Sequence, residues 1–199
     1  MRVCHRIVKL FFPQPDGEHD HATAEYLAYC SLIAQRVCLP PSDTGAKRIV
    51  PYCYSLVSRH NLRLQMKRHT LWKGPAKQML REGPLCGLLM EFLPDCTTVM
   101  ADPARLANQP ELADDIVAAL RTIHGAGVLH RDPLPRNMML DPEGGVWWVD
   151  FGLAENTAYS AIHGTFCDSE VRRVDWLLRN DVIPAVREGR MAVWESLGQ

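Results

Sequence analysis

The segment 130–152 reads HRDPLPRNMMLDPEGGVWWVDFG and places three polar side chains at the two ends of a short hairpin. Asp132 and Asn137 precede the apolar run MML, and Asp150 follows the apolar run VWWV. Between the two runs, residues 141–145 contain a Pro and paired Gly, which are typical of a turn. A hairpin returns the chain to the edge where it began, so we expect these three side chains to lie close together.

Each of these residue types has a chemical reason to be there. A carboxylate at Asp132 can accept a proton from an incoming hydroxyl. The neutral amide oxygen of Asn137 can ligate a hard cation without adding repulsion, and Asp150 at a strand end can hold a divalent ion. Gly152 lets the backbone turn away sharply. The segment therefore predicts a site for a magnesium nucleotide.

The motif HRDxxxxN at 130–137, followed by DFG at 150–152, resembles the catalytic and magnesium loops of the protein-kinase-like superfamily. The resemblance implies an α+β, two-lobed fold, and it implies ATP and Mg²⁺ as cofactors. The expected activity is transfer of a γ-phosphate to a hydroxyl acceptor in a protein or a small molecule. The alternative is a catalytically impaired or truncated kinase-like protein that binds a partner and keeps the loops for packing.

The resemblance divides the chain into two parts. Residues 1–93 correspond to a truncated amino-terminal lobe and hinge, with a basic insertion at 58–84. Residues 94–199 correspond to a short, mainly helical carboxy-terminal lobe, similar to atypical small kinases such as the RIO kinases or the kinase subunit of the tRNA threonylcarbamoylation complex. Residues 1–100 carry a net charge of +5 and residues 101–199 a net charge of −6, which suits a cleft between phosphates and metal, or two solvated faces.

Two charged residues upstream complete the proposed nucleotide site. Residues 6–12 (RIVKLFF) have the apolar and β-branched character of a strand that contains Lys9. The family resemblance implies that Lys9 contacts the α- and β-phosphates, whereas the motif alone also fits a surface lysine. A helix is predicted over 22–37, and Glu25 on its first turns resembles the glutamate that pairs with the strand lysine.

Residues 85–93 (LCGLLMEFL) read as a buried strand that leads into a lobe linker. The resemblance implies that backbone groups of Glu91 and Leu93 hydrogen-bond an adenine, with Met90 at the back of the pocket. An ordinary core strand ending at Pro94 is the alternative.

Further elements follow from patterning. A strand is predicted over 49–57, a helix opening at Pro110 with an apolar stripe, and a helix over 171–178. The resemblance implies that Asp175 in the last helix holds the backbone of the catalytic loop. The residues Gly164, Thr165 and Glu170 faintly resemble an activation-segment pattern, and we interpret this as chance.

The chain also departs from the family pattern. No GxGxxG occurs, and only eight residues precede Lys9, which predicts a fragment, a misplaced start, or a site without a glycine-rich lid. Leu134 stands where protein Ser/Thr kinases place a lysine, while Arg136 resembles the arginine of tyrosine-kinase loops. The class of acceptor therefore stays open.

Composition indicates the expected environment. The seven Cys are scattered without a CxxC pair, which favours reduced thiols in an intracellular protein. Residues 1–12 lack an uninterrupted signal-peptide core, and no apolar run reaches membrane-spanning length. We expect a soluble cytoplasmic or nuclear protein without a membrane partner. The basic insertion 58–84 reads as a solvated loop, although its charge leaves binding of nucleic acid open.

Overall fold

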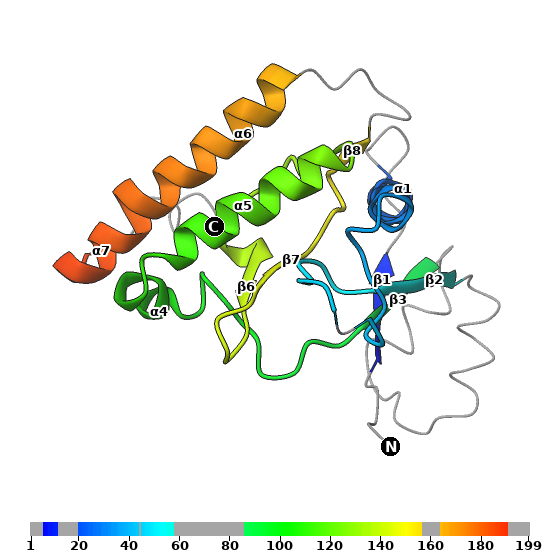
Figure 1. The fold of residues 1–199 in the computed structure, drawn as a ribbon, viewed down its shortest axis with the longest axis horizontal. Coiled ribbons are helices and arrows are strands. Elements are labelled where there is room, and N and C mark those ends of the chain that lie inside the picture. The colour runs from blue at the N-terminus through cyan, green and yellow to red at the C-terminus, as the bar shows by residue number, and fades with distance from the viewer. Residues whose placement is uncertain (1–5, 12–19, 44, 58–85, 157–163, 191–199) are drawn as a thin grey trace.

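The computed structural model describes residues 6–11, 20–43, 45–57, 86–156 and 164–190 (Figure 1). The basic insertion predicted at 58–84 lies outside the described residues. The described chain is a mixed α+β structure, with a small sheet and one helix on one side and a group of helices on the other (Figure 1).

The first sheet contains three antiparallel strands in the order β1-β3-β2. Their bounds are β1 Arg6–Phe11, β2 Cys53–Val57 and β3 Cys86–Glu91. Lys9 pairs with Leu88 across the first ladder. Gly87 is required at this contact, because a Cβ there would lie 2.9 Å from a Val8 methyl and 3.0 Å from the Lys9 carbonyl oxygen. The strands predicted around Lys9 and before Pro94 are confirmed.

The strand predicted over 49–57 begins later than expected, at Cys53. Pro51 has no N–H group to donate to a ladder. The carbonyl of Ile49 instead accepts a hydrogen bond from the Trp148 backbone N–H at 2.8 Å. The first part of the predicted strand therefore contacts the hairpin segment that contains Trp148, and not this sheet.

Helix α1, His21–Ala34, packs beside this sheet (Figure 1). Asp20 caps it, because its side chain accepts from the Thr23 N–H at 3.1 Å. The helix ends three residues earlier than predicted, since Arg36 adopts a left-handed φ of 58° and the Val37 N–H returns to the Leu32 carbonyl at 2.8 Å. Its buried face includes the carboxylate of Glu25.

The predicted hairpin is confirmed as β6 Met138–Leu140 and β7 Val146–Trp148. The Asp141 side chain closes its turn by accepting from the N–H groups of Glu143 and Gly145 at 3.1 and 2.7 Å. Strand β4 Thr97–Thr98 pairs with β6, and β5 Val128–Leu129 pairs with β8 Glu155–Asn156. Asn137 directly precedes β6 and Asp150 follows shortly after β7, so these polar residues lie at the ends of the hairpin, as predicted from the sequence.

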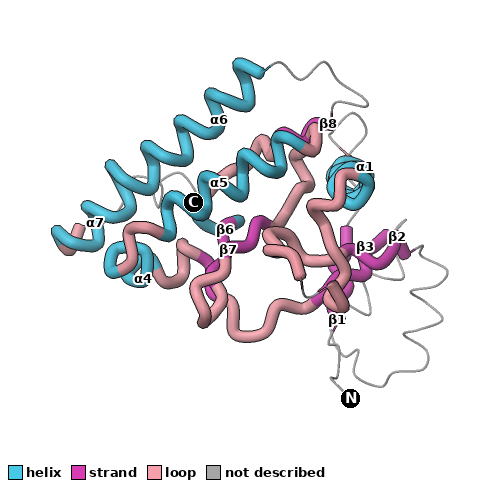
Figure 2. Tube along the Cα trace, viewed as in Figure 1, coloured by secondary structure: helices cyan, strands magenta, loops and turns pink. Residues whose placement is uncertain are grey.

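The remaining helices are α4 Pro103–Asn108, α5 Leu112–Gly125, α6 Gly164–Trp176 and α7 Ile183–Glu188. Helices α4 and α7 lie on the side of the hairpin away from α1, and α5 runs past the hairpin toward β8 (Figure 2). The predicted apolar stripe of α5 is buried at Leu112, Ile116, Leu120 and Ile123. A π-helical turn, Leu177–Val182, joins α6 to α7 just before Pro184, which has no N–H to donate into the helix.

One hydrophobic core connects these elements, and Tyr29, Trp148 and Phe151 are its largest fully buried aromatic side chains. The Trp148 indole N–H donates to the Ile116 carbonyl at 3.1 Å, which fixes the hairpin against α5. All six described cysteines are free thiols. Within the described ranges, no helix is both long enough and apolar enough to cross a bilayer.

Candidate active site

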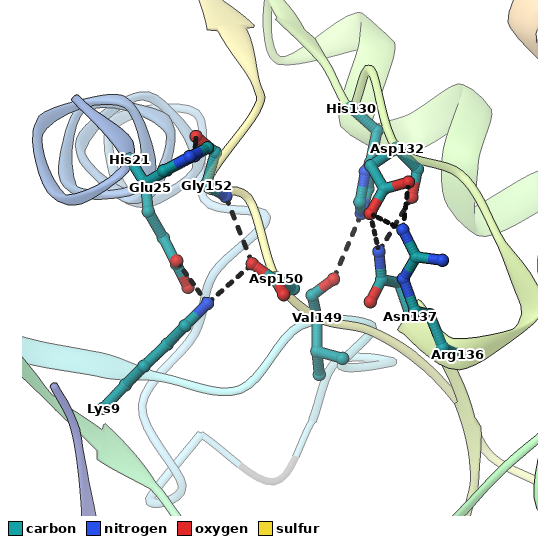
Figure 3. A network of polar contacts seen from close by, with 10 residues as sticks. All are labelled: Lys9, His21, Glu25, His130, Asp132, Arg136, Asn137, Val149, Asp150 and Gly152. Atoms are coloured by element: carbon teal, nitrogen blue, oxygen red, sulfur yellow. Dashed lines mark hydrogen bonds and ion pairs between the residues drawn. The ribbon is translucent and has the colours of Figure 1, made fainter. Parts of the chain in front are cut away.

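Lys9 joins three distant segments of the chain (Figure 3). Its Nζ lies 2.6 Å from Glu25 Oε2 on α1 and 2.6 Å from Asp150 Oδ1 after β7. The side chain of Lys9 is 31% exposed, that of Glu25 is fully buried, and that of Asp150 is 50% exposed. The predicted pairing of Lys9 with Glu25 is therefore present in the structure, and Asp150 shares the same ammonium group.

Burial and the shared lysine affect the two carboxylates differently. Burial raises the pKa of Glu25, and the attraction of Lys9 only partly opposes it. The Phe151 backbone amide also favours charged Glu25, although Glu25 Oε1 is buried and makes no hydrogen bond within the described structure. Burial also tends to raise the pKa of Asp150, but the charge and hydrogen bond of Lys9 outweigh it, so that pKa is lowered.

Asp132, in the loop 130–137, is held by two neighbours (Figure 3). An Nη of Arg136 lies 2.9 Å from each carboxylate oxygen, and Asn137 Nδ2 donates to Oδ2 at 2.8 Å. The Asn137 amide also donates to the Asp132 carbonyl at 2.8 Å. Both neighbours belong to the short 3₁₀ turn Pro135–Asn137, which fixes this geometry.

Asn137 and Asp150 are suited to the predicted metal. Both hydrogen bonds of Asn137 Nδ2 go to Asp132, so Oδ1 lies on the side of the amide that faces away from Asp132 (Figure 3). The Asn137 carbonyl accepts from the Val149 N–H at 3.1 Å, which places it beside the backbone that carries Asp150. Asp150 adopts a left-handed φ of 65°, and its Oδ1 also lies 3.4 Å from the Gly152 N–H.

The donor set is small. No group of three or more His, Cys, Asp or Glu side chains that could hold a metal occurs among the residues the structure describes. An oxygen site here would consist of one carboxylate and one amide, a pair that suits Mg²⁺, which keeps several of its waters.

An aromatic cluster supports both loops. The His130 ring lies 4.9 Å from Phe151 and 5.1 Å from Trp148, and Tyr29 of α1 meets Phe151 edge-on at 5.4 Å. Burial lowers the pKa of His130, which keeps the ring neutral, and its Nε2 donates to the Val149 carbonyl at 3.2 Å. The loop 130–137, the DFG segment and α1 therefore share one packed contact.

The residue that holds the backbone of the loop 130–137 is Glu170 and not Asp175. Glu170 Oε1 accepts from the Arg131 N–H at 2.7 Å, and Oε2 accepts from the His130 N–H at 3.1 Å. His124 Nε2 also lies 2.7 Å from Oε2. Asp175 instead pairs with Arg179 at 2.8 Å and is 48% exposed, so the prediction for Asp175 is wrong.

Helical geometry explains this correction. Residues five apart on a helix lie about 140° apart around its axis, so Glu170 and Asp175 cannot both face the loop. Glu170 shares the buried face with Val171 and Val174. Burial alone would raise the pKa of Glu170, but the hydrogen bonds from His124 and the Arg131 backbone outweigh it, and that pKa is lowered. Neither Gly164 nor Thr165 forms an activation segment, because both begin α6.

The predicted adenine-contacting residues lie at the end of β3. The Glu91 N–H already donates to the Tyr52 carbonyl at 2.8 Å, so only its carbonyl could serve an adenine. Its side chain accepts from the Tyr52 N–H at 3.0 Å and pairs with Arg48. Leu93 is half-buried just beyond the strand, and Met90 is buried within it. Arg48, which the sequence reasoning missed, also lies 5.2 Å above the Trp147 ring.

The sequence is similar to protein kinases over part of their length, which supports a protein-kinase-like superfamily and a kinase-like phosphotransferase at the family level. No family model matches the chain.

Three relatives illustrate the similarity. A probable cell division protein kinase of Encephalitozoon cuniculi is 27% identical over 111 residues, which are 54% of this chain and 32% of that protein. A cAMP-dependent protein kinase catalytic subunit of Mus musculus is 29% identical over 132 residues, which are 64% of this chain and 34% of that protein. A cAMP-dependent protein kinase catalytic subunit-like protein of Caenorhabditis briggsae is 46% identical over 72 residues, which are 34% of this chain and 19% of that protein. The chain spans about a third of the length of the first two.

Proposed function

We propose that this chain is an ATP- and Mg²⁺-dependent phosphotransferase of the protein-kinase-like type, which transfers a γ-phosphate to a hydroxyl of a protein acceptor. The observation that carries the proposal is the position of Lys9 Nζ, 2.6 Å from both Glu25 and Asp150. The sequence predicts these three residues on chemical and family grounds, and they come from segments up to 141 residues apart. We would not expect an unrelated fold to place these three side chains in contact.

Each residue has a proposed role. Asp132 would orient the acceptor hydroxyl and take its proton, while Asn137 and Asp150 would hold Mg²⁺. Lys9 would steady the phosphates, with Glu25 holding Lys9 in place. The metal, when bound, supplies neutralisation of charge on the transferring phosphoryl group. Catalysis in this reaction class is mainly positioning and electrostatic stabilisation, which is what these residues offer.

The nucleotide would lie between two lobes, residues 1–93 and 94–199. The adenine would meet the Glu91 carbonyl and the Leu93 N–H, with Met90 behind it. The protein acceptor is proposed because the similar proteins are named protein kinases.

The direct test is phosphate transfer from labelled Mg-ATP to a mixed peptide library, together with thermal unfolding in the presence of Mg-ATP. Stabilisation should require the metal and grow with ligand concentration, as mass action demands. Asp132→Ala should retain this stabilisation and lose transfer. Glu143→Ala, an exposed acid in the β6–β7 turn, is the matched control and should retain both.

The same pair of measurements separates the catalytically impaired alternative. Metal-dependent stabilisation without transfer by the parent chain would indicate a nucleotide-binding protein that has lost catalysis. The proposed function would be refuted if the parent chain showed no stabilisation and no transfer at millimolar Mg-ATP.

A further inference from the structure

A pocket lies between the catalytic loop and the first turns of α6, outside the proposed nucleotide site. We name it the Arg173 pocket; its lining residues are Leu129, Arg131, Pro133, Phe166, Ser169, Glu170 and Arg173. Its volume is about 230 Å³. This is below the roughly 300 Å³ at which whole small-molecule sites begin, so it fits one side group of a larger ligand.

The pocket carries an excess of positive charge. Glu170 is its only acid, and both of its oxygens are already used by the backbone N–H groups of His130 and Arg131 and by the His124 ring. The Arg131 guanidinium pairs with Glu155 through its Nε, which lies 2.9 Å from Glu155 Oε1, and it makes no other side-chain hydrogen bond or ion pair within the described part of the chain. Arg173 makes no ion pair or hydrogen bond within the described ranges of the chain. The guanidinium donors that remain favour an anion, because such groups bind carboxylates and phosphates through two parallel hydrogen bonds.

The walls of the pocket provide apolar contacts, and Ser169 provides a hydroxyl donor. Phe166 is 52% exposed, an unusual amount for a phenylalanine, and it stands on the same helix as Arg173. Leu129 and Pro133 are buried beneath. An anion on a short aliphatic stem would satisfy this lining better than a free inorganic ion, because its carbon atoms would cover the exposed ring.

The pocket is adjacent to the proposed catalytic base. Two of its lining residues, Arg131 and Pro133, flank Asp132 in the chain. The carboxylate of Glu170 that holds the loop backbone at 2.7 and 3.1 Å also belongs to the lining. The distance between the pocket and Asp132 is therefore fixed by the same hydrogen bonds that fix the loop.

We infer that the Arg173 pocket binds an anionic side chain of the protein acceptor, close in sequence to the hydroxyl that is phosphorylated. The inference rests on the proposed function and assigns to it a substrate class: acceptors with a neighbouring glutamate, aspartate or phosphorylated residue. Arg173 is the specificity-determining residue, since Arg131 is partly engaged with Glu155.

Binding of labelled peptides to the 199-residue chain tests this directly, without any need for transfer. Four peptide series carry a glutamate, a phosphoserine, a glutamine or a lysine at each position around one hydroxyl, and fluorescence anisotropy gives each Kd. We expect the anionic peptides to bind more tightly than the neutral and basic peptides at one or two positions, with the preference weakening as salt rises. The glutamate and phosphoserine series distinguish a carboxylate from a phosphate ligand.

The decisive variants differ by one position on α6. Arg173→Glu should weaken binding of the preferred anionic peptide by about tenfold or more, a size expected for hydrogen bonds to charged groups. Arg172→Glu makes the same change of charge on the next residue, which is exposed and does not line the pocket, and should change the Kd by less than about threefold. Arg173→Gln removes the positive charge without adding a negative one and should act in the same direction as Arg173→Glu. Equal losses in the Arg172 and Arg173 variants, or equal Kd values for anionic and neutral peptides, would overturn the inference.

Transfer assays then separate the two proposals. In an active enzyme, Arg173→Glu should lower kcat/KM for the anionic peptide relative to the neutral one while leaving stabilisation by Mg-ATP unchanged. Transfer without any preference for anionic peptides would refute the role of the Arg173 pocket and support the proposed function. Arg173-dependent binding of anionic peptides without transfer would support the role of the pocket and count against the proposed function.

Discussion

The ion pair between Lys9 and Glu25 gives a prediction that does not depend on catalysis. Lys9→Met keeps the length and apolar stem of the side chain and removes the only cation that contacts Glu25 among the described residues. The Glu25 carboxylate is fully buried, and Oε1 has no hydrogen bond to any described residue. The variant therefore leaves a buried carboxylate without its ionic partner.

The expected cost follows from burial and exposure. Removing one partner of a buried ion pair costs roughly 3–5 kcal/mol. Lys9 is 31% exposed, so part of its charge is already solvated, and Glu25 can protonate when the lysine is lost. We therefore expect Lys9→Met to lower the free energy of unfolding by about 2 kcal/mol, which is a fall in Tm of about 4–8 °C for a chain of this length.

The cost should depend on pH in a defined direction. The folded-state pKa of Glu25 is raised above its ordinary value of 4.5, so its protonated form is favoured in the folded state. The contribution of this raised pKa to the free energy of unfolding is fully present below the ordinary pKa of 4.5 and is lost as pH rises through the folded-state pKa. Lys9→Met removes a group that lowers this pKa, which moves the loss toward higher pH. The variant should thus be closer to the parent at pH 5 than at pH 8.

Urea unfolding of a double-mutant cycle measures the pair. Glu25→Gln in the Lys9→Met background should recover part of the lost stability, because a neutral amide replaces the unpaired charge. Lys47→Met is the matched control, since the Lys47 pair with Asp115 has the same 2.6 Å distance but 62% and 43% exposure, and should cost less than about 0.5 kcal/mol. Strictly additive losses in the cycle, or an equal loss for Lys47→Met, would refute the reasoning.

Three further predictions concern the proposed activity. Asp132→Ala should reduce transfer by about 10²- to 10⁴-fold without weakening binding of ATP, as kinetics and a binding titration would show, and equal activity would exclude its role as a base. Asp150→Asn should weaken binding of Mg-ATP more than Lys9→Met does, and titrations giving the reverse order would mean that Lys9 mainly holds the phosphates. Glu170→Gln should slow transfer by about tenfold or more with little change in ATP affinity, since the amide keeps only one of the two oxygens that accept the loop N–H bonds and places an NH2 group against the other N–H; an unchanged kcat would reject this positioning role.

The parts of the fold predicted from sequence are those whose cause is local. The β6–β7 hairpin was predictable because Asp141 and the paired Gly set the turn while the flanking runs are apolar. The apolar stripe of α5 was predictable from its spacing alone. The late start of β2 was not, because Ile49 pairs with Trp148, a partner 99 positions away that no local pattern identifies.

The candidate site also contains residues that the sequence predicted and one that it did not. The family motifs identified Lys9, Glu25 and Asp150, and the structure brings these together. Glu170 was missed because the prediction rested on the family's residue type and not on the helical face. Its position next to Val171 and four residues before Val174, both buried, was the available signal, since residues spaced by four share a face.

Charge balance gives a physical reason why Asp150 should matter more than Lys9 for metal binding. One ammonium group, Lys9, stands between two carboxylates, so this part of the site carries one uncompensated negative charge when both carboxylates are ionised. Glu25 is fully buried and cannot receive a hydrated ion, whereas Asp150 is half exposed and its lowered pKa keeps it ionised. Lys9 and the Gly152 N–H both contact Asp150 Oδ1, so Oδ2 can ligate a cation without breaking the contact with Lys9. Under the proposed function, metal and lysine would therefore bind the same carboxylate through different oxygens. Replacing Lys9 would preserve the anionic ligand, and replacing Asp150 would remove it.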